Sequence, residues 1–491
     1  MMKAVQYLFL CILLASTTFA LEDLSSAKEI IVNSSLRSTL HVARTANSRV
    51  EQITAELYYF PLASKTLILQ EQNINPEPRK IKEKLHFLWK NPSQDIIEIR
   101  VDSIIKSTAD WPAITKKTQF PITTLPPEVM PYVMPSKMID SQNPEIRAMA
   151  DMLAQNETDL FELATKIAGW TKNNVKYNLS TLTAEVIQPA SWVLRERYGV
   201  CDEMTGLFIA LLRALGIPAR YVSGISYTNS PLFDEKWGSH GWAEVFFPEI
   251  GWLPFDPTFG QFGWVDATHI KLRDSVDSSE PSVEFTWKAS KANITADKLN
   301  VKTTLLKAIP AIEQRLSISV IPLKREVGFG SFNVVEATIT NLMNYSIGAD
   351  ISLAQVTELD MIDASSRPLY LSPKQTKTVY WLAQVKVGLN ESYSYEIPLL
   401  VFSERNESDK KFFKAQSNGL VYKKETFNNI LKAEQAGITR VHTNKTVVLA
   451  QENKSVEHKN VSTTIIANTW SETLQEYLLK LLNGIKGVLT W

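Results

Sequence analysis

The segment YGVCDEMTGLFIALLRALGIPARYVSG, residues 198–224, places a cysteine at the start of a predicted helix. Its apolar residues repeat at helical spacing: Met204, Leu207, Phe208, Leu211, Leu212 and Leu215. Gly216 and Pro218 end the pattern, as a C-cap glycine and a helix breaker do. Cys201 therefore lies in the predicted first turn. There, free backbone N–H groups and the helix dipole stabilise a thiolate and an oxyanion that forms beside it.

Cys201 is expected to be the one thiol of the mature chain. The other cysteine, Cys11, lies in the apolar N-terminal run of MMKAVQYLFLCILLASTTFA. Lys3 precedes this run and Thr18-Phe19-Ala20 follows it, which predicts a signal peptide over residues 1–20. An uncleaved membrane anchor is the alternative. A lone cysteine in an exported protein is either buried and inert or a reactive thiol.

Length and charge narrow the class of protein further. A chain of 491 residues is expected to form about two to four domains. Lys+Arg and Asp+Glu are both 52, a balance that argues against nucleic-acid binding. Ten Asn-x-Ser/Thr sites fit an exported, glycosylated surface and an extracytoplasmic location; they are Asn33, Asn156, Asn178, Asn293, Asn344, Asn390, Asn406, Asn444, Asn453 and Asn460.

A base for the thiol is predicted at His240. This histidine opens HGWAEVFFPEIGWLPFDPT, residues 240–258, which reads as two strands around a PEIG turn. A hairpin centred near Pro248 would set His240 opposite Asp256, with Cβ atoms about 5 Å apart, whereas a strict four-residue turn would shift this register. Asp256 could then fix the tautomer of His240. Among the other histidines, His269 has no acidic partner at an obvious spacing.

Taken singly, these residues have ordinary structural explanations. A lone cysteine on a helix is most often a small buried hydrophobe, a lone histidine on a strand is usually structural, and Asp before Pro often opens a turn. Together, and in this order, they closely resemble the transglutaminase-like superfamily, in exported prokaryotic form. The matching patterns are G-x-C followed by A-L-G-I-P-A-R-x-V, then H-x-W-x-E-V, then D-P-T.

The resemblance covers about residues 150–270 and implies a papain-like α+β core. It implies that Cys201 is the nucleophile, His240 the general base and Asp256 its orienting partner. Trp242 matches a family tryptophan beside the histidine, and core packing explains it equally well. Gln188 and Trp192 are candidates for an oxyanion hole, with ordinary helix-leading residues as the alternative.

The resemblance also implies acyl transfer through a thioester, without a cofactor or metal. Water as acceptor would make the chain a peptidase or amidase, which we favour, acting on a peptide or protein substrate. An amine would make it a cross-linking transglutaminase. The chain lacks the calcium-loop pattern of D-x-[DN]-x-[DN]-G and the zinc-binding CxxC pairs. A non-catalytic cell-surface scaffold is the third reading, and an intact triad argues against it.

The regions around the core are predicted to be mostly β. Period-2 stretches indicate an N-terminal β-rich domain at 21–123, a proline-rich linker at 124–138 and the core at 139–275. A polar connection at 276–310 leads to a β-sandwich at 311–410. A polar tail at 411–491 ends in an amphipathic helix from Trp470, for which docking on protein is favoured over contact with a membrane surface.

Overall fold

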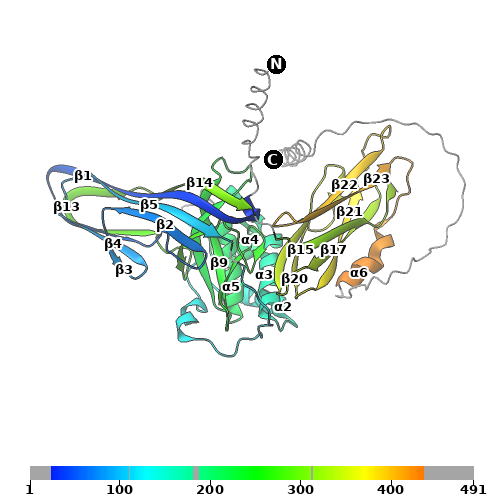
Figure 1. Cartoon of the computed structure of the whole chain (residues 1–491), viewed down its shortest axis with the longest axis horizontal. Helices are drawn as coiled ribbons and strands as arrows, with labels where there is room; N and C mark the ends of the chain where they lie inside the picture. Colours follow the sequence, from blue (N-terminus) through cyan, green and yellow to red (C-terminus); the bar gives the residue numbers. More distant parts are fainter. Residues whose placement is uncertain (1–23, 110, 181–186, 311–312, 436–491) are drawn as a thin grey trace, which may run out of the picture.

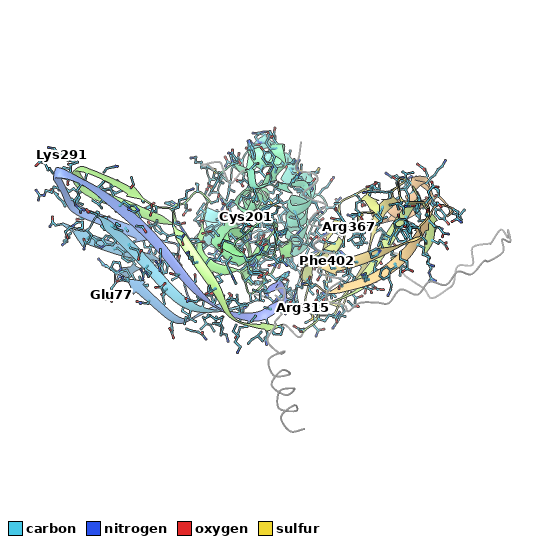
Figure 2. The ribbon with its side chains drawn as sticks, turned by 90° about the horizontal axis from the view of Figure 1, so that it is seen from above. Glu77, Cys201, Lys291, Arg315, Arg367 and Phe402 are labelled. Carbon is cyan, nitrogen blue, oxygen red and sulfur yellow. The ribbon has the colours of Figure 1, made fainter. Side chains whose placement is uncertain are left out.

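A computed structural model describes residues 24–109, 111–180, 187–310 and 313–435 of the chain. Within these residues, a helix-containing core lies between two lobes built of strands (Figure 1). In Figure 2, Cys201 lies in this core, Lys291 marks the far tip of one lobe and Phe402 belongs to the other. Strands far outnumber helices in the described part of the chain, so the fold is mostly β around a mixed helical and β core.

The first lobe is a sheet organised around one long strand, β1 (Ala27–Leu57). One edge of β1 pairs with β5 and β4, and the other edge pairs with β13 and β14, all antiparallel. Buried and exposed side chains alternate along much of β1, as expected for a strand with one face on a core. The remaining strands of this sheet are β2 (Leu67–Asn75), β3 (Arg79–Ile81), β4 (Lys84–Lys90), β5 (Ile96–Thr108), β13 (Val283–Ala296) and β14 (Asn300–Pro310).

The prediction of a polar connection at 276–310 is wrong, because β13 and β14 occupy most of it. Side chains of both strands are mostly exposed, so the apolar alternation that reveals a half-buried strand is absent. Hydrogen bonds to β1, rather than burial, define these strands. The chain therefore passes through the core and then returns to complete the first sheet.

The core packs helices against an antiparallel sheet. Helix α5 (Cys201–Ala214) is buried along almost its whole length and contacts β8 and β9. The predicted end of this helix is confirmed, since Gly216 adopts a φ of 74° directly after it. The other core elements are α2 (Pro144–Ala154), α3 (Leu160–Asn174), β6 (Lys176–Tyr177), α4 (Ala190–Glu196), β7 (Tyr198–Gly199), β8 (Ala219–Tyr227), β9 (Trp237–Phe247), β10 (Gly251–Asp256), β11 (Gln261–Phe262) and β12 (Ile270–Ser275).

The second lobe consists of two sheets that share one hydrophobic core. One sheet has the order β15-β17-β21-β19. The other continues the sheet of the core, because β11 pairs with β18 through Phe262 and Gly348. The strands are β15 (Leu316–Pro322), β16 (Glu326–Gly328), β17 (Phe332–Asn341), β18 (Ile347–Leu353), β19 (Leu359–Met361), β20 (Ser366–Leu371), β21 (Thr376–Val385), β22 (Tyr395–Ser403) and β23 (Ser408–Gln416).

The predicted boundary at residue 410 falls inside β23, which pairs with β22 along its whole length. The lobe therefore continues past 410, and the first residues of the predicted polar tail belong to it. A short helix, α6 (Asn428–Gln435), follows. The predicted signal peptide and terminal helix lie outside the described residues. Of the helices in the described ranges, none has both the length and the apolar character needed to cross a bilayer.

The proline-rich segment at 124–138 is held against the core by Arg213. Its guanidinium donates to the carbonyl of Met134 at 3.0 Å, to that of Val276 at 2.7 Å and to that of Ala219 at 2.8 and 3.0 Å. Arg213 is 3% exposed. One buried side chain thus ties the end of α5 to the start of β8, to the proline-rich segment and to the chain that leaves β12.

Arg213→Met should lower the free energy of unfolding by about 2–4 kcal/mol, because it leaves several buried carbonyls without a donor. Urea unfolding followed by tryptophan fluorescence measures this loss. Arg195→Met is the matched control: its guanidinium is half exposed and lies 3.4 Å from Glu145, so its effect should stay within about 0.5 kcal/mol. Equal losses in the two variants would contradict the assigned role of Arg213.

Candidate active site

Cys201 is the first residue of α5, as the sequence predicts. Glu203 fixes this helix start, because its carboxylate accepts from the backbone N–H of Val200 at 3.0 Å and from that of Gln188 at 3.3 Å. Glu203 is only 3% exposed, so both bonds are shielded from water. The thiol is therefore presented by a helix whose first turn is anchored to the preceding chain.

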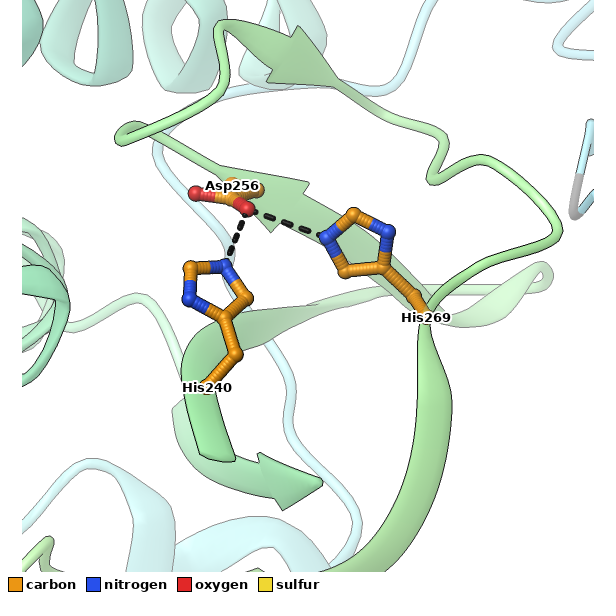
Figure 3. Close-up of side chains that lie close together, drawn as sticks. All are labelled: His240, Asp256 and His269. Atoms are coloured by element: carbon orange, nitrogen blue, oxygen red, sulfur yellow. Dashed lines mark hydrogen bonds and ion pairs between the residues drawn. The ribbon is translucent and has the colours of Figure 1, made fainter. Parts of the chain in front are cut away.

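His240 and Asp256 meet on the hairpin formed by β9 and β10. Asp256 Oδ2 lies 2.6 Å from His240 Nε2 (Figure 3). The contact is as predicted, but the predicted register is not. Phe255 on β10 pairs with Ala243 on β9. If this register continues, Asp256 lies opposite Trp242, and His240 is two residues from Trp242 along β9. The two side chains bridge this diagonal, which is within reach across neighbouring strands.

The carboxylate of Asp256 is fully buried and accepts four hydrogen bonds. Its Oδ1 accepts from the backbone N–H groups of Thr258 at 2.7 Å and Phe259 at 3.1 Å, in the turn that follows β10. Burial raises the pKa of Asp256, but the charge and hydrogen bonds of His240 and His269 outweigh it and hold the pKa well below its ordinary value. Asp256 is therefore ionised at neutral pH and able to orient His240.

The prediction that His269 lacks an acidic partner is wrong. Its Nε2 lies 3.1 Å from Asp256 Oδ2, and its Nδ1 lies 3.2 Å from Asp266 Oδ1 (Figure 3). Burial lowers the pKa of His269, but the charge of Asp266 and the hydrogen bonds to both carboxylates raise it to about 9. The sequence did carry one signal, since Asp266 and His269 are three residues apart.

The surroundings of the sulfur differ from the expected low-pKa thiolate. Burial raises the pKa of the Cys201 thiol well above its ordinary value, and the neighbouring carboxylate of Asp202 raises it further. Sγ lies 3.7 Å from Asp202 Oδ1, while the backbone N–H of Gly241 lowers the pKa by hydrogen bonding to the sulfur. The proton is thus held on the thiol until a base accepts it.

Gly241 must be a glycine for the chain to approach Cys201 this closely. A Cβ at this position would lie 1.9 Å from the hydroxyl of Tyr221 and 2.8 Å from Asp202 Oδ1. Both distances are shorter than real Cβ contacts, so a side chain here would displace Tyr221 and Asp202, which are hydrogen-bonded to each other. The close approach aims the Gly241 N–H at the sulfur, where an oxyanion would also form.

Cys201 and His240 share the wall of a cavity of about 570 Å³. The loop between β8 and β9, residues 228–236, forms part of its rim. That this loop borders the cavity could not be predicted from the sequence, because its residues match no motif. Seven aromatic and apolar residues line the cavity, two of them from this loop: Val175, Tyr177, Met204, Leu232, Phe233, Trp237 and Phe259.

The other residues singled out by the sequence have different surroundings. Trp242 is 2% exposed and stacks on His240 at 6.1 Å between ring centroids, so it packs in the core and also contacts the candidate base. Gln188 and Trp192 are absent from the lining of the cavity. Trp192 instead meets the ring of Tyr198 edge-on at 5.0 Å. Gln188 lies beside the start of α5, where its backbone N–H donates to Glu203, and a part for either residue in an oxyanion hole stays a prediction.

His240 Nε2, Asp256 Oδ2 and His269 Nε2 lie within 4.8 Å of one another, a grouping that metal ions also use. The 2.6 Å between the first two atoms is too short for two ligands of one tetrahedral zinc ion, which would lie about 3.3 Å apart. Both ring nitrogens of His269 already face carboxylates. The spacing is that of hydrogen bonds, and the residues present do not fit a zinc ion.

Comparison with known proteins identifies the core. Residues 147–257 match the family model of the transglutaminase-like superfamily. An uncharacterised Bacillus subtilis protein, YebA, is 28% identical over 149 residues, and a Pseudomonas aeruginosa protein-glutamine gamma-glutamyltransferase is 31% identical over 123 residues. An uncharacterised Mycobacterium tuberculosis protein is 31% identical over 175 residues. These matches cover 28%, 24% and 33% of this chain but only 20%, 18% and 49% of the relatives.

Asp202→Asn should make Cys201 react with iodoacetamide at lower pH than in the wild type. The carboxylate raises the pKa of the thiol, so removing its charge lowers that pKa and increases the thiolate fraction at any pH below the plateau. Labelling rates followed by mass spectrometry from pH 5 to pH 10 measure the shift. Asp234→Asn, on the exposed β8–β9 loop, is the control and should leave the profile unchanged. A shift to higher pH in Asp202→Asn would contradict the assigned electrostatics.

Proposed function

Because residues 147–257 belong to the transglutaminase-like superfamily, we propose that the chain is a cysteine-dependent acyl-transfer enzyme. The proposed reaction is hydrolysis of amide bonds in a peptide or protein, through a thioester on Cys201. His240 is the proposed general base and Asp256 the residue that orients it. The observation that carries this proposal is the buried His240–Asp256 pair, 2.6 Å apart, whose histidine lines the cavity that Cys201 also lines.

The hydrogen bond between His240 and Asp256 favours the tautomer that this role needs. Its Nε2 faces Asp256, an ionised acceptor, and therefore carries a proton. In the neutral ring Nδ1 is then the unprotonated nitrogen, which can accept the thiol proton. The raised pKa of Cys201 favours this route, because the sulfur does not lose its proton to solvent at neutral pH.

The proposed cycle has two halves. Sγ attacks the amide carbonyl as its proton moves to His240, and the tetrahedral oxyanion is stabilised by N–H groups such as that of Gly241. The C–N bond breaks, the leaving amine takes the proton from His240, and a thioester remains. Water then attacks the thioester, His240 accepts a proton from it, and the acid leaves as that proton returns to sulfur.

The molecule that accepts the acyl group from the thioester distinguishes two versions of this proposal. We favour water, which gives a peptidase or amidase. A primary amine would give a cross-linking enzyme, and the name of the Pseudomonas relative, which covers only the shared core, supports keeping that alternative. A binding scaffold without turnover is the third candidate. The buried and fully hydrogen-bonded Asp256 argues against it, because a binding surface has no need of an ionised carboxylate behind its histidine.

Cys201→Ala should abolish hydrolysis of a dye-labelled casein, and His240→Ala should lower kcat by about 10²- to 10⁴-fold, the usual contribution of a general base. His240→Ala should also move the labelling of Cys201 by iodoacetamide to higher pH. Dye release measures turnover, and incorporation of a fluorescent amine into the same casein measures transfer. Unchanged labelling in His240→Ala would overturn the enzyme proposal, and amine incorporation exceeding hydrolysis would reverse the choice of acceptor.

We also propose that the enzyme is exported and works outside the cytoplasm, after removal of the predicted signal peptide. The expected outcome is a mature protein that begins at Leu21, directly after Thr18-Phe19-Ala20. N-terminal sequencing of the protein recovered from outside the cytoplasm measures the cleavage site. A recovered protein that begins at Met1 would show that the apolar run stays attached and acts as an anchor.

A further inference from the structure

Behind the proposed triad lies a second pair of titratable residues, His269 and Asp266. His269 comes directly before β12, and its side chain is completely buried. Its ring is enclosed by three others that meet it edge-on: those of Trp242 at 5.1 Å, Phe259 at 5.3 Å and His240 at 5.5 Å. A charged or polar ring in such a place is costly unless every ring nitrogen is satisfied.

Asp266 is an acceptor through both of its oxygens. The backbone N–H of Asp266 donates to Gln261 Oε1 at 3.0 Å, which fixes the orientation of that amide, so Gln261 Nε2 is the group that donates to Asp266 Oδ2 at 2.6 Å. The backbone N–H of Thr268 donates to Oδ1 at 2.7 Å, and the Thr268 hydroxyl donates to it as well. A carboxyl whose two oxygens both accept in this way is ionised.

The hydrogen bonds of His269 then determine its protonation. Nδ1 faces the ionised Asp266 at 3.2 Å and Nε2 faces the ionised Asp256 at 3.1 Å, and neither carboxylate has a proton to donate. Both ring nitrogens must therefore carry hydrogen, which makes the ring an imidazolium. Asp256 Oδ2 thus receives one N–H from His240 and a second from His269, and the two rings reach it from different directions (Figure 3).

We propose that His269 is a positioning residue, a buried imidazolium that holds the carboxylate of Asp256 in the orientation that serves His240. Asp266 supplies the countercharge that keeps this imidazolium in place. The titratable and charged groups near the pair are Asp256 from β10, His240 from β9 and, on the side of Asp266, Glu404 and the guanidinium of Arg405 from the second lobe. The inference rests on the proposed function only in so far as Asp256 orients a catalytic base.

The first experiment reads the protonation of His269 directly, in the full chain labelled with ¹⁵N-histidine. His269→Gln identifies the resonances of this residue by their loss. At pH 8 an ordinary histidine, with a pKa of about 6.5, is neutral, whereas His269 should show two protonated ring nitrogens. A neutral His269 ring at pH 7 would overturn the proposal. This measurement does not depend on whether the chain is an enzyme.

The second experiment separates positioning from packing with two charge-matched double variants. Both remove one positive and one negative charge: His269→Gln with Asp266→Asn keeps an N–H donor toward Asp256, and His269→Met with Asp266→Asn does not. Three quantities are measured: the rate of Cys201 alkylation by iodoacetate at the pH where the wild type reacts fastest, the low-field NMR resonance of the His240 Nε2–H proton, and the melting temperature. The glutamine variant should stay within about threefold of the wild-type rate, and the methionine variant should lose about tenfold or more.

The outcomes distinguish this proposal from the proposed function. Positioning is supported if only the glutamine variant keeps the alkylation rate of Cys201 near that of the wild type. The His240 Nε2–H resonance should then be retained in the glutamine variant and shifted or broadened in the methionine variant. The positioning proposal would be overturned if the two double variants had equal alkylation rates and equal His240 Nε2–H resonances, with rate losses that follow the melting temperature. The enzyme proposal would then stay intact. Absence of casein hydrolysis and of amine incorporation by the wild type would overturn the enzyme proposal, and the two NMR signals would still decide whether His269 fixes Asp256.

Discussion

The buried charge of Asp256 constrains this core more than any other single group. Moving a carboxylate out of water costs several kcal/mol even after relaxation, so the surrounding chain must supply donors at hydrogen-bonding distance. Four do so, and they come from β9, from the turn after β10 and from the loop before β12. The need to satisfy one carboxylate therefore fixes three segments relative to one another. It also fixes His240, the side chain that closes the network toward the cavity.

Burial raises the pKa at both ends of the site, but the net outcomes are opposite. At Asp256 it is outweighed by cationic and N–H partners, and the group stays ionised. At Cys201 it is reinforced by Asp202, and the group stays protonated. A proton held on sulfur near an imidazole oriented by a carboxylate is poised to move only when the sulfur attacks. In the proposed mechanism, the thiol is thereby protected from unwanted reaction before substrate binds, and every turnover requires His240.

The parts of the site that the sequence predicts are those encoded by short-range pattern. The start and end of α5 follow from apolar spacing, Gly216 and Pro218, and the meeting of His240 with Asp256 follows from two strands around a tight turn. The hairpin register was missed by two residues because the turn after Phe247 was centred one residue too early. The contact of His269 with Asp256 was missed for a different reason. Twelve residues, most of them outside regular structure, separate the two, and no periodicity relates them.

The strands β13 and β14 were not predicted because they form through pairing with the distant strand β1 and have no apolar face that would reveal them in the sequence. A similar dependence on distant chain applies to the site. Directly after Asp256, β11 pairs with both β10 and β18, so the sheet that carries His240 continues into the second lobe. The loop that follows β11 carries Asp266 and His269, and the charge of Arg405 from that lobe acts on Asp266. The second lobe therefore contributes to the surroundings of the proposed triad, through the strand pairing that follows Asp256 and through the charge of Arg405 near Asp266.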